Sequence, residues 1–208
     1  MTGTSRGSAA AGGQPRSRRR ADAQRSIAAV LDAAERVLVQ RPEASMDEIA
    51  RAAGVTRQTV YAHFRSRDAL LRALLERFTQ RVAAVLDAAD LECGPAADAI
   101  VRFLDCAWQA SAAEPLLLHI SQQSRTAQED DSLHQPIIGR LYALIRRGQD
   151  HGEFDPELPA AWLATTTITL AHTAAEEARA GRMTDDEAIT ALRRTVPRML
   201  AGSLPRTG

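Results

Sequence analysis

Cysteines and long apolar runs are scarce in this chain, and their scarcity narrows the class of protein. Cys93 and Cys106 are too few for a disulfide framework, and they lack the spacing of metal ligands. No uninterrupted apolar run reaches membrane-spanning length, and residues 1–20 lack the apolar core of a signal peptide. We therefore expect a cytoplasmic protein with no membrane partner and no metal site.

Lysine is absent, so every basic residue is Arg, and the zero net charge hides an uneven distribution. Residues 1–81 hold 15 Arg against 8 Asp and Glu, a net charge of +7, whereas residues 82–208 hold 11 against 18, a net charge of −7. A basic N-terminal part fits a polyanionic partner. The planar guanidinium group of Arg can donate two parallel hydrogen bonds, which suits phosphate and guanine.

Helical periodicity runs through the chain, and no segment shows the convincing alternation of a strand. A first helix is expected over residues 27–38, and a longer one is expected to follow Ser66 and to end or break at Gly94-Pro95. Pro197 predicts a kink or an early end in the last helix. The remaining helices are expected over residues 96–112, 115–125, 132–151, 159–180 and 185–201. The fold class is therefore all-α, without an internal repeat.

Two short helices with a tight turn between them are expected after the first helix. Residues 45–48 form a capping-box pattern, and Gly54 stands where a positive φ would close the helix. Thr56 can then cap a helix over residues 57–63. That helix is too short to be stable alone, so Val60 must pack against its neighbours while the opposite face stays exposed.

The segment from Ser45 to Leu71 resembles the signature of the tetracycline-repressor (TetR) family: a capped helix, an Ala-Gly-Val turn, a helix with Thr-Val-Tyr, then Phe and a basic residue before Leu. The rest of the chain resembles the family in length, helical content and its two long terminal helices. The resemblance implies a disordered basic tail over residues 1–20, a three-helix helix-turn-helix DNA-binding domain over 21–66, and a larger helical effector-binding and dimerisation domain over 67–203. It also implies a transcriptional regulator, either a repressor released from its operator by a small molecule or an activator.

Base recognition is expected from the first turn of the exposed short helix, which can enter a major groove about 12 Å wide. Arg57 suits guanine O6 and N7, and Gln58 suits adenine N6 and N7. Ala62 is small where many relatives carry an aromatic residue, so its base contact should be weaker. The candidate DNA-binding residues are Ser45, Thr56, Arg57, Gln58, Thr59, Tyr61, His63 and Arg67.

Docking on the DNA backbone is implied by the resemblance for other members of this set. Thr59, Tyr61 and His63 match family positions that touch sugar-phosphate or bases, and Arg67 matches the basic residue that begins the next helix. Ser45 can add a phosphate contact to its capping role. Tyr61 could instead be a partly buried turn residue, and His63 could simply cap the helix.

Three further surfaces follow from the same pattern. Residues 16–20 form a basic arm for phosphates or a narrow minor groove, or else a solvated tail. The resemblance implies a homodimer that forms through the last two long helices, with an intrachain core as the alternative. Their candidate residues are Trp162, Leu163, Thr166, Ile168, Leu170, Ala171, Thr173, Ile189, Leu192, Val196 and Leu200. The candidate effector pocket, with core and structural roles as alternatives, comprises Phe103, Trp108, Leu117, His119, Tyr142 and His172.

Two other functions remain alternatives. A helical enzyme could use His119 and His134 with nearby acids such as Glu114, but no nucleophile elbow, phosphate loop or compact metal constellation accompanies them. A DNA-free adaptor could bind a protein through the last two helices, although it would leave the N-terminal motif unexplained. We therefore expect a regulator without enzymatic activity or a cofactor.

Overall fold

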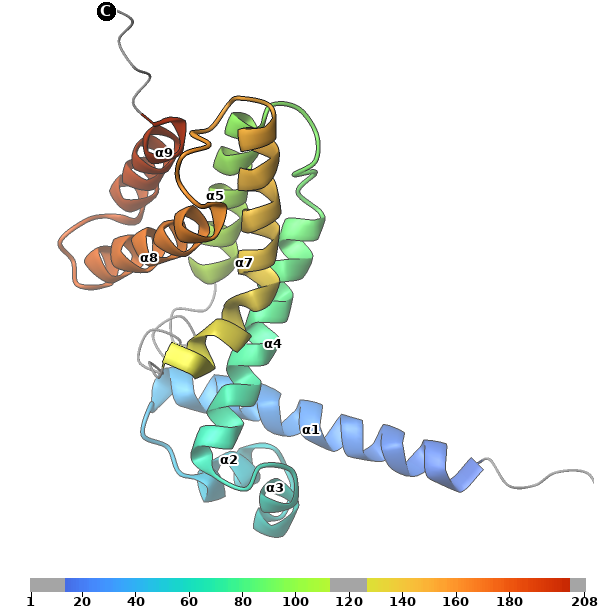
Figure 1. Ribbon diagram of the computed structural model, residues 1–208. Coiled ribbons are helices and arrows are strands. Elements are labelled where there is room, and N and C mark those ends of the chain that lie inside the picture. The colour runs from blue at the N-terminus through green and yellow to red at the C-terminus, as the bar shows by residue number, and fades with distance from the viewer. Residues whose placement is uncertain (1–13, 113–126, 203–208) are drawn as a thin grey trace, which may run out of the picture. The chain divides into compact units, whose positions relative to one another are not determined.

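The computed structural model describes the backbone of residues 14–112 and 127–202, and the side chains of residues 20–111 and 135–202. All regular elements in these ranges are helices (Figure 1), as the sequence predicts. They are α1 (Gln14–Gln40), α2 (Met46–Ala52), α3 (Arg57–His63), α4 (Arg67–Asp87), α5 (Ala96–Ala112), α7 (Ala127–Asp150), α8 (Ala160–Arg179) and α9 (Asp185–Ala201). The helix expected over residues 115–125 lies outside the described residues.

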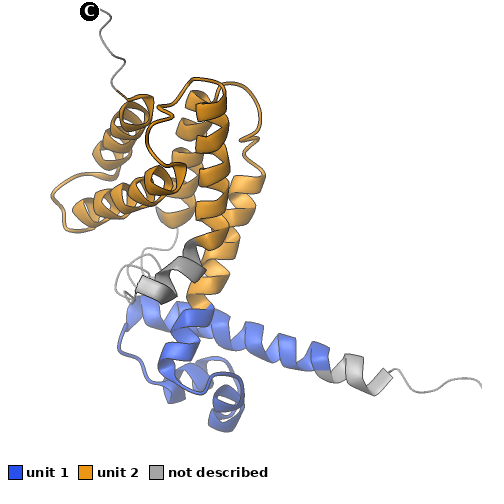
Figure 2. Cartoon of the chain, viewed as in Figure 1, with its two compact units in different colours: residues 1–73 blue, residues 74–208 orange. Residues whose placement is uncertain are grey.

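The chain divides into two compact units, residues 1–73 and 74–208, and the boundary falls inside α4 (Figure 2). In the first unit α2 packs against both α1 and α3. Its buried apolar side chains come from all four helices and include Val30, Leu38, Ile49, Val60 and Leu70. This shared core holds two helices of seven residues that could not persist alone.

The second unit is built from the rest of α4 and from α5, α7, α8 and α9. Helix α5 packs against α7 and α9, and α8 packs against α7 and α9 (Figure 1). Buried side chains on these helices form its core, among them Phe103, Leu141, Leu163 and Val196. The described helices include none that is long and apolar enough to cross a membrane.

The expected start of α1 and the expected end of α4 are wrong. Helix α1 begins at Gln14 rather than near residue 27. Helix α4 ends at Asp87 rather than at Gly94-Pro95, because a turn follows in which Asp90 has φ 48° and Arg102 of α5 donates to the carbonyls of Asp90 and Cys93. Helix α9 has the expected bounds and continues through Pro197 to Ala201, so the early end that Pro197 could cause does not occur. Its last turn is anchored from outside, since Leu200 is buried and its carbonyl accepts the Asp155 amide at 2.8 Å.

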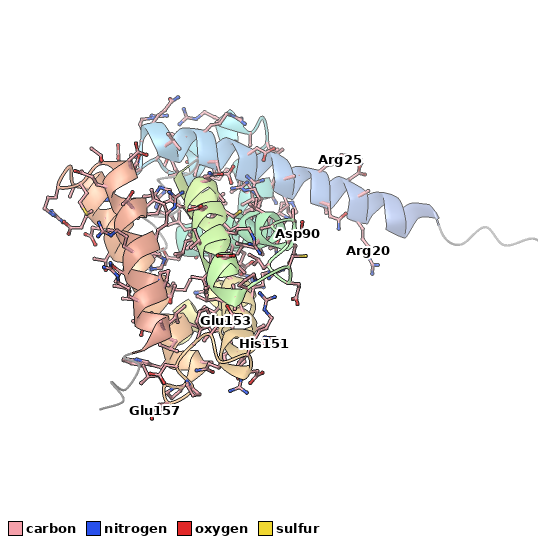
Figure 3. All side chains as sticks on the ribbon, turned by 90° about the horizontal axis from the view of Figure 1, so that it is seen from above. Arg20, Arg25, Asp90, His151, Glu153 and Glu157 are labelled. Atoms are coloured by element: carbon pink, nitrogen blue, oxygen red, sulfur yellow. The ribbon has the colours of Figure 1, made fainter. Side chains whose placement is uncertain are left out.

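Glu153 caps the N-terminus of α5 from the turn between α7 and α8. Its carboxylate accepts the amides of Ala96 and Ala97 at 2.9 and 3.0 Å, and Figure 3 shows it beside that helix end. These two backbone hydrogen bonds lower the pKa of Glu153 below its ordinary value of 4.5, and the positive charges of His151 and Arg147 lower it further. A depressed carboxyl pKa stabilises the fold above the unfolded-state pKa, and this stabilisation is lost as the pH falls through the folded-state pKa.

Glu153→Gln is therefore expected to lower the melting temperature at neutral pH, and the difference from wild type should shrink below about pH 4.5. Circular dichroism melts over a pH series measure it. Glu157→Gln, at an exposed residue of the same turn, is the control and should track wild type. If the melting temperature of Glu153→Gln stayed equally far below that of wild type down to about pH 3, the role of the charge would be contradicted.

Candidate nucleic-acid interface

Helix α2 begins with the predicted capping box. The Glu48 amide donates to Ser45 Oγ at 3.3 Å, and the Glu48 carboxylate accepts from the Ser45 amide and hydroxyl, both at 2.9 Å. The Ser45 backbone and side-chain hydrogen bonds, with Arg41 nearby, lower the pKa of Glu48. The hydroxyl of Ser45 is thus engaged in the cap, and its contact with phosphate stays a prediction.

The turn between α2 and α3 also has the predicted form. Gly54 has φ 69°, a conformation that glycine adopts without the cost a Cβ would add. The Gly54 amide donates to Arg51 O at 3.2 Å, and the Val55 amide donates to Ala50 O at 3.1 Å. The chain therefore reverses tightly enough for Thr56 to start the next helix at once.

Helix α3 has one buried and one open side. Thr56 caps it by accepting the Thr59 amide at 3.1 Å, and the two threonine hydroxyls lie 2.8 Å apart. Val60 is completely buried, and the adjoining Phe64, which ends the helix, is buried as well. The helix is therefore docked through its apolar side.

The open side of α3 carries the predicted polar set. Arg57, Gln58 and Tyr61 are exposed, whereas Thr59 and His63 are half-buried. Tyr61 is 38% exposed and lies within the helix. His63 meets the Phe64 ring edge-on, with 6.4 Å between the ring centroids, so it also supports the end of the helix.

Arg57 has two partners at the start of α3. Its Nη1 donates to Asp47 Oδ2 of α2 at 2.9 Å, and its guanidinium carbon lies 5.2 Å from the centroid of the Tyr61 ring. Asp47 was not among the residues predicted from the sequence. The acid stands ten positions before Arg57, and only the packing of α2 on α3 brings the two together.

Arg67 lies at the base of α4 and is half-buried. Its guanidinium donates to the carbonyls of Ala44 and Pro42, in the turn between α1 and α2. Ser66 caps α4 as predicted by accepting the Ala69 amide at 3.1 Å. Arg67 therefore ties α4 to that turn, and its contact with DNA stays a prediction.

The basic arm, residues 16–20, lies within α1, which begins at Gln14. The side chains of Arg16, Arg18 and Arg19 lie outside the described side chains. Arg20 and Arg25 both project from this helix (Figure 3), and Arg20 is exposed. Arg25 is hydrogen-bonded to Asp22. The arm's contact with DNA stays a prediction.

The candidate effector residues are spread over different environments in the second unit. Phe103 is buried in the core, Trp108 and His172 are half-buried, and Tyr142 is 43% exposed. Leu117 and His119 lie outside the described residues. An effector pocket formed by this set stays a prediction.

The apolar stripe of α9 belongs to the core of its own chain. Ile189, Leu192, Val196 and Leu200 are all buried, and α9 packs on α5 and α8. The alternative of an intrachain core therefore holds for this stripe. On α8, by contrast, Leu163 is buried but Trp162 is 63% exposed.

The described side chains contain no group of three or more His, Cys, Asp or Glu residues that could hold a metal ion. His119, Glu114 and the side chain of His134, which the enzyme alternative would use, lie outside the described residues.

The fold and the site together define an all-helical protein with an N-terminal helix-turn-helix. The family model of bacterial regulatory proteins, tetR family, matches residues 30–74. HTH-type transcriptional regulator AlkX of Mycobacterium tuberculosis is 32% identical over 154 residues, which cover 70% of this chain and 69% of AlkX. The chain belongs to the TetR family of bacterial regulatory proteins.

Two further relatives align with this chain over very different lengths. An uncharacterized HTH-type transcriptional regulator of M. tuberculosis, Rv1255c, is 53% identical over 55 residues, 26% of this chain and 27% of that regulator, so the match spans about a quarter of its length. HTH-type transcriptional repressor LfrR of Mycolicibacterium smegmatis is 28% identical over 160 residues, 76% of this chain and 82% of LfrR. The structure of LfrR with proflavine aligns with a TM-score of 0.62 at 24% identity, over 86% of this chain and 98% of that chain, and shows the shared fold.

Proposed function

We propose that this chain is a sequence-specific DNA-binding transcriptional regulator that binds its operator as a homodimer and leaves it when a small molecule binds. The observation that carries the proposal is the open side of α3, where Arg57, Gln58 and Tyr61 are exposed while Val60 fixes the helix from behind. The DNA-binding domain would comprise residues 21–66, and residues 67–203 would bind the effector and the second copy.

Helix α3 would enter the major groove. Seven residues span about 10 Å, which fits a groove about 12 Å wide. Arg57 and Gln58, in the first turn, would read guanine and adenine. The other members of the set would position the helix by contacts with the DNA backbone: Ser45, Thr56, Thr59, Tyr61, His63 and Arg67.

The second copy would pack on the exposed side of α8. Trp162 is the most exposed large apolar side chain on that helix, and Thr165, Thr169 and Thr173 follow it at intervals of three or four residues. Small and hydroxyl-bearing side chains allow close approach of a partner helix, and Trp supplies buried area. Two copies would present two α3 helices to successive major grooves, about 34–36 Å apart.

Release by an effector is the regulatory part of the proposal. The relative LfrR is named as a repressor, and its solved structure holds proflavine. A small molecule that binds the second unit better in the released conformation would lower the affinity for operator by the same coupling free energy. The effector residues would include Phe103, Trp108, Leu117, His119, Tyr142 and His172.

Selective DNA binding is the test of the proposal. Duplexes enriched by the wild-type protein from a random pool would be compared with shuffled duplexes by fluorescence anisotropy at two salt concentrations. The wild type is expected to prefer the enriched duplex, and both affinities should fall as salt rises. Arg57→Ala should lower the preference by roughly 5- to 100-fold, whereas Tyr61→Ala should weaken binding to both duplexes.

The outcomes separate the alternatives. Equal weak binding of both duplexes would remove sequence recognition from the proposal. Binding to no DNA at low salt, with α8 and α9 capturing a protein instead, would favour the adaptor. Selective binding by a monomer would contradict only the homodimer.

A further inference from the structure

The contact between Asp47 and Arg57 places a negative charge on the surface proposed to bind DNA, where it would be expected to disfavour binding. A carboxylate stands beside the residue proposed to read guanine, where it would face the phosphates of bound DNA. Like charges brought together on docking weaken association. The acid would therefore lower general DNA affinity, and any benefit that it brings must lie elsewhere.

Two contacts fix the position of the Arg57 guanidinium group, and they leave some of its N–H donors available to DNA. Asp47 accepts from Nη1 on one side, and the Tyr61 ring lies 5.2 Å from the guanidinium carbon, one helical turn along α3. The guanidinium group has five N–H donors in a planar fork. A bond through Nη1 leaves the edge formed by Nε and Nη2 for a second pair of acceptors, such as O6 and N7 of guanine.

The ion pair is also weak enough to restrict the rotamers of Arg57 and still allow Arg57 to bind a base. The Arg57 side chain is 65% exposed and that of Asp47 is 45% exposed. Ion pairs at such exposed positions contribute little to stability. An Arg side chain that is already restricted loses less rotamer freedom when it binds.

We infer that Asp47 is a positioning residue that orients Arg57 for base recognition and thereby raises selectivity at the expense of general DNA affinity. This inference rests on the proposed function, in which α3 reads DNA. It predicts that removal of the acid changes two quantities in opposite directions. Affinity for any DNA should rise, because repulsion of the phosphates is relieved. Selectivity should fall, because Arg57 is no longer oriented toward the base that it reads.

The experiment compares full-length variants by anisotropy on the enriched duplex, on its single-base variants and on the shuffled duplex. Asp47→Ala is expected to bind the shuffled duplex more tightly and to lower the selectivity ratio on the order of three- to tenfold. Asp47→Asn keeps an acceptor oxygen and should lie between wild type and Asp47→Ala. Glu43→Gln, which removes an exposed charge from the neighbouring turn, is the matched control and should leave the ratio unchanged.

The double variant decides whether Asp47 acts through Arg57. In an Arg57→Ala background, Asp47→Ala should no longer change the selectivity ratio. An equal fall of the ratio in both backgrounds would overturn the inference, as would an unchanged ratio in the single variant or a larger gain in affinity for the enriched duplex than for the shuffled one. If the wild type shows no selectivity, both the proposed function and the inference about Asp47 fail. If the wild type is selective and only the Asp47 effects are missing, the proposed function stands.

Discussion

The Val60→Asp variant is expected to lose about 3–5 kcal/mol of folding stability in the first unit and, with it, all selective DNA binding. Val60 is the fully buried side chain that docks α3, a helix of seven residues with no stability of its own. An unpaired carboxylate at this position would have to be desolvated or would drive the helix out of its site. Circular dichroism should show lost helicity, and anisotropy should show lost selectivity.

Ala62→Asp is the matched control for this variant, because it places the same charge on the exposed side of the same helix. Its stability should fall by about 1 kcal/mol at most, through the lower helix propensity of Asp and its charge in the last turn of α3. Its affinity for DNA should still fall by about tenfold or more, since the new charge would repel the phosphates of DNA bound at α3. The two tryptophans, Trp108 and Trp162, both lie in the second unit, so their fluorescence reports whether that unit survives Val60→Asp. Unchanged stability of Val60→Asp would show that α3 is not held by this side chain.

The second large effect is expected from Gly148→Ala in α7. A Cβ built on Gly148 would overlap Cδ2 and Cε2 of the buried Phe154 ring. The Gly148 carbonyl also accepts the amides of Glu153 and Phe154, at 2.8 and 3.2 Å, so the ring is held close to the helix. Displacing it should cost about 2 kcal/mol net of the better helix propensity of Ala.

Gly139→Ala supplies the opposite case on the same helix. Gly139 is exposed, and a Cβ at this position would have no neighbour within 4 Å. The substitution should therefore add about 0.5–1 kcal/mol through helix propensity alone. Urea titrations followed by tryptophan fluorescence should thus place the two variants on opposite sides of wild type. Stabilisation by both substitutions would mean that Phe154 moves aside at no cost.

The sequence predicts correctly those helix bounds and N-caps that are set by residues close together in the chain. Helices α3, α5 and α9 have the predicted bounds, and the caps at Ser45, Thr56 and Ser66 form as their patterns indicate. Each of these caps rests on a side chain within four residues of the backbone group that it satisfies. A single sequence contains all of that information.

Distant groups decide where α4 ends and help to hold the last turn of α9. The end of α4 at Asp87 depends on Arg102, which donates to carbonyls nine and twelve residues earlier. The last turn of α9 is held in part by Asp155, whose amide, 45 positions before Leu200, donates to the Leu200 carbonyl. Neither partner could be identified from periodicity.

The candidate site divides in the same way. The exposed positions of Arg57, Gln58 and Tyr61 follow from helical spacing around Val60. The engagement of Arg57 by Asp47, and of Arg67 by two carbonyls of the preceding turn, required the packing of separate helices. Arg57 and Arg67 are both predicted to contact DNA, but their contacts within the protein differ. Arg57 is bonded to a side chain, and Arg67 is bonded to backbone carbonyls.

The division of α4 between the two units has a consequence for protein engineering. Because the boundary falls between Ala73 and Leu74, inside a continuous helix, parts of different proteins joined there would meet without a flexible linker. Each residue inserted at that point would turn everything after it by about 100° around the helix axis. Leu74 and Phe78 would then leave the face that they share with Leu70. Chimeras that exchange residues 1–73 should therefore preserve the register of α4 across the junction.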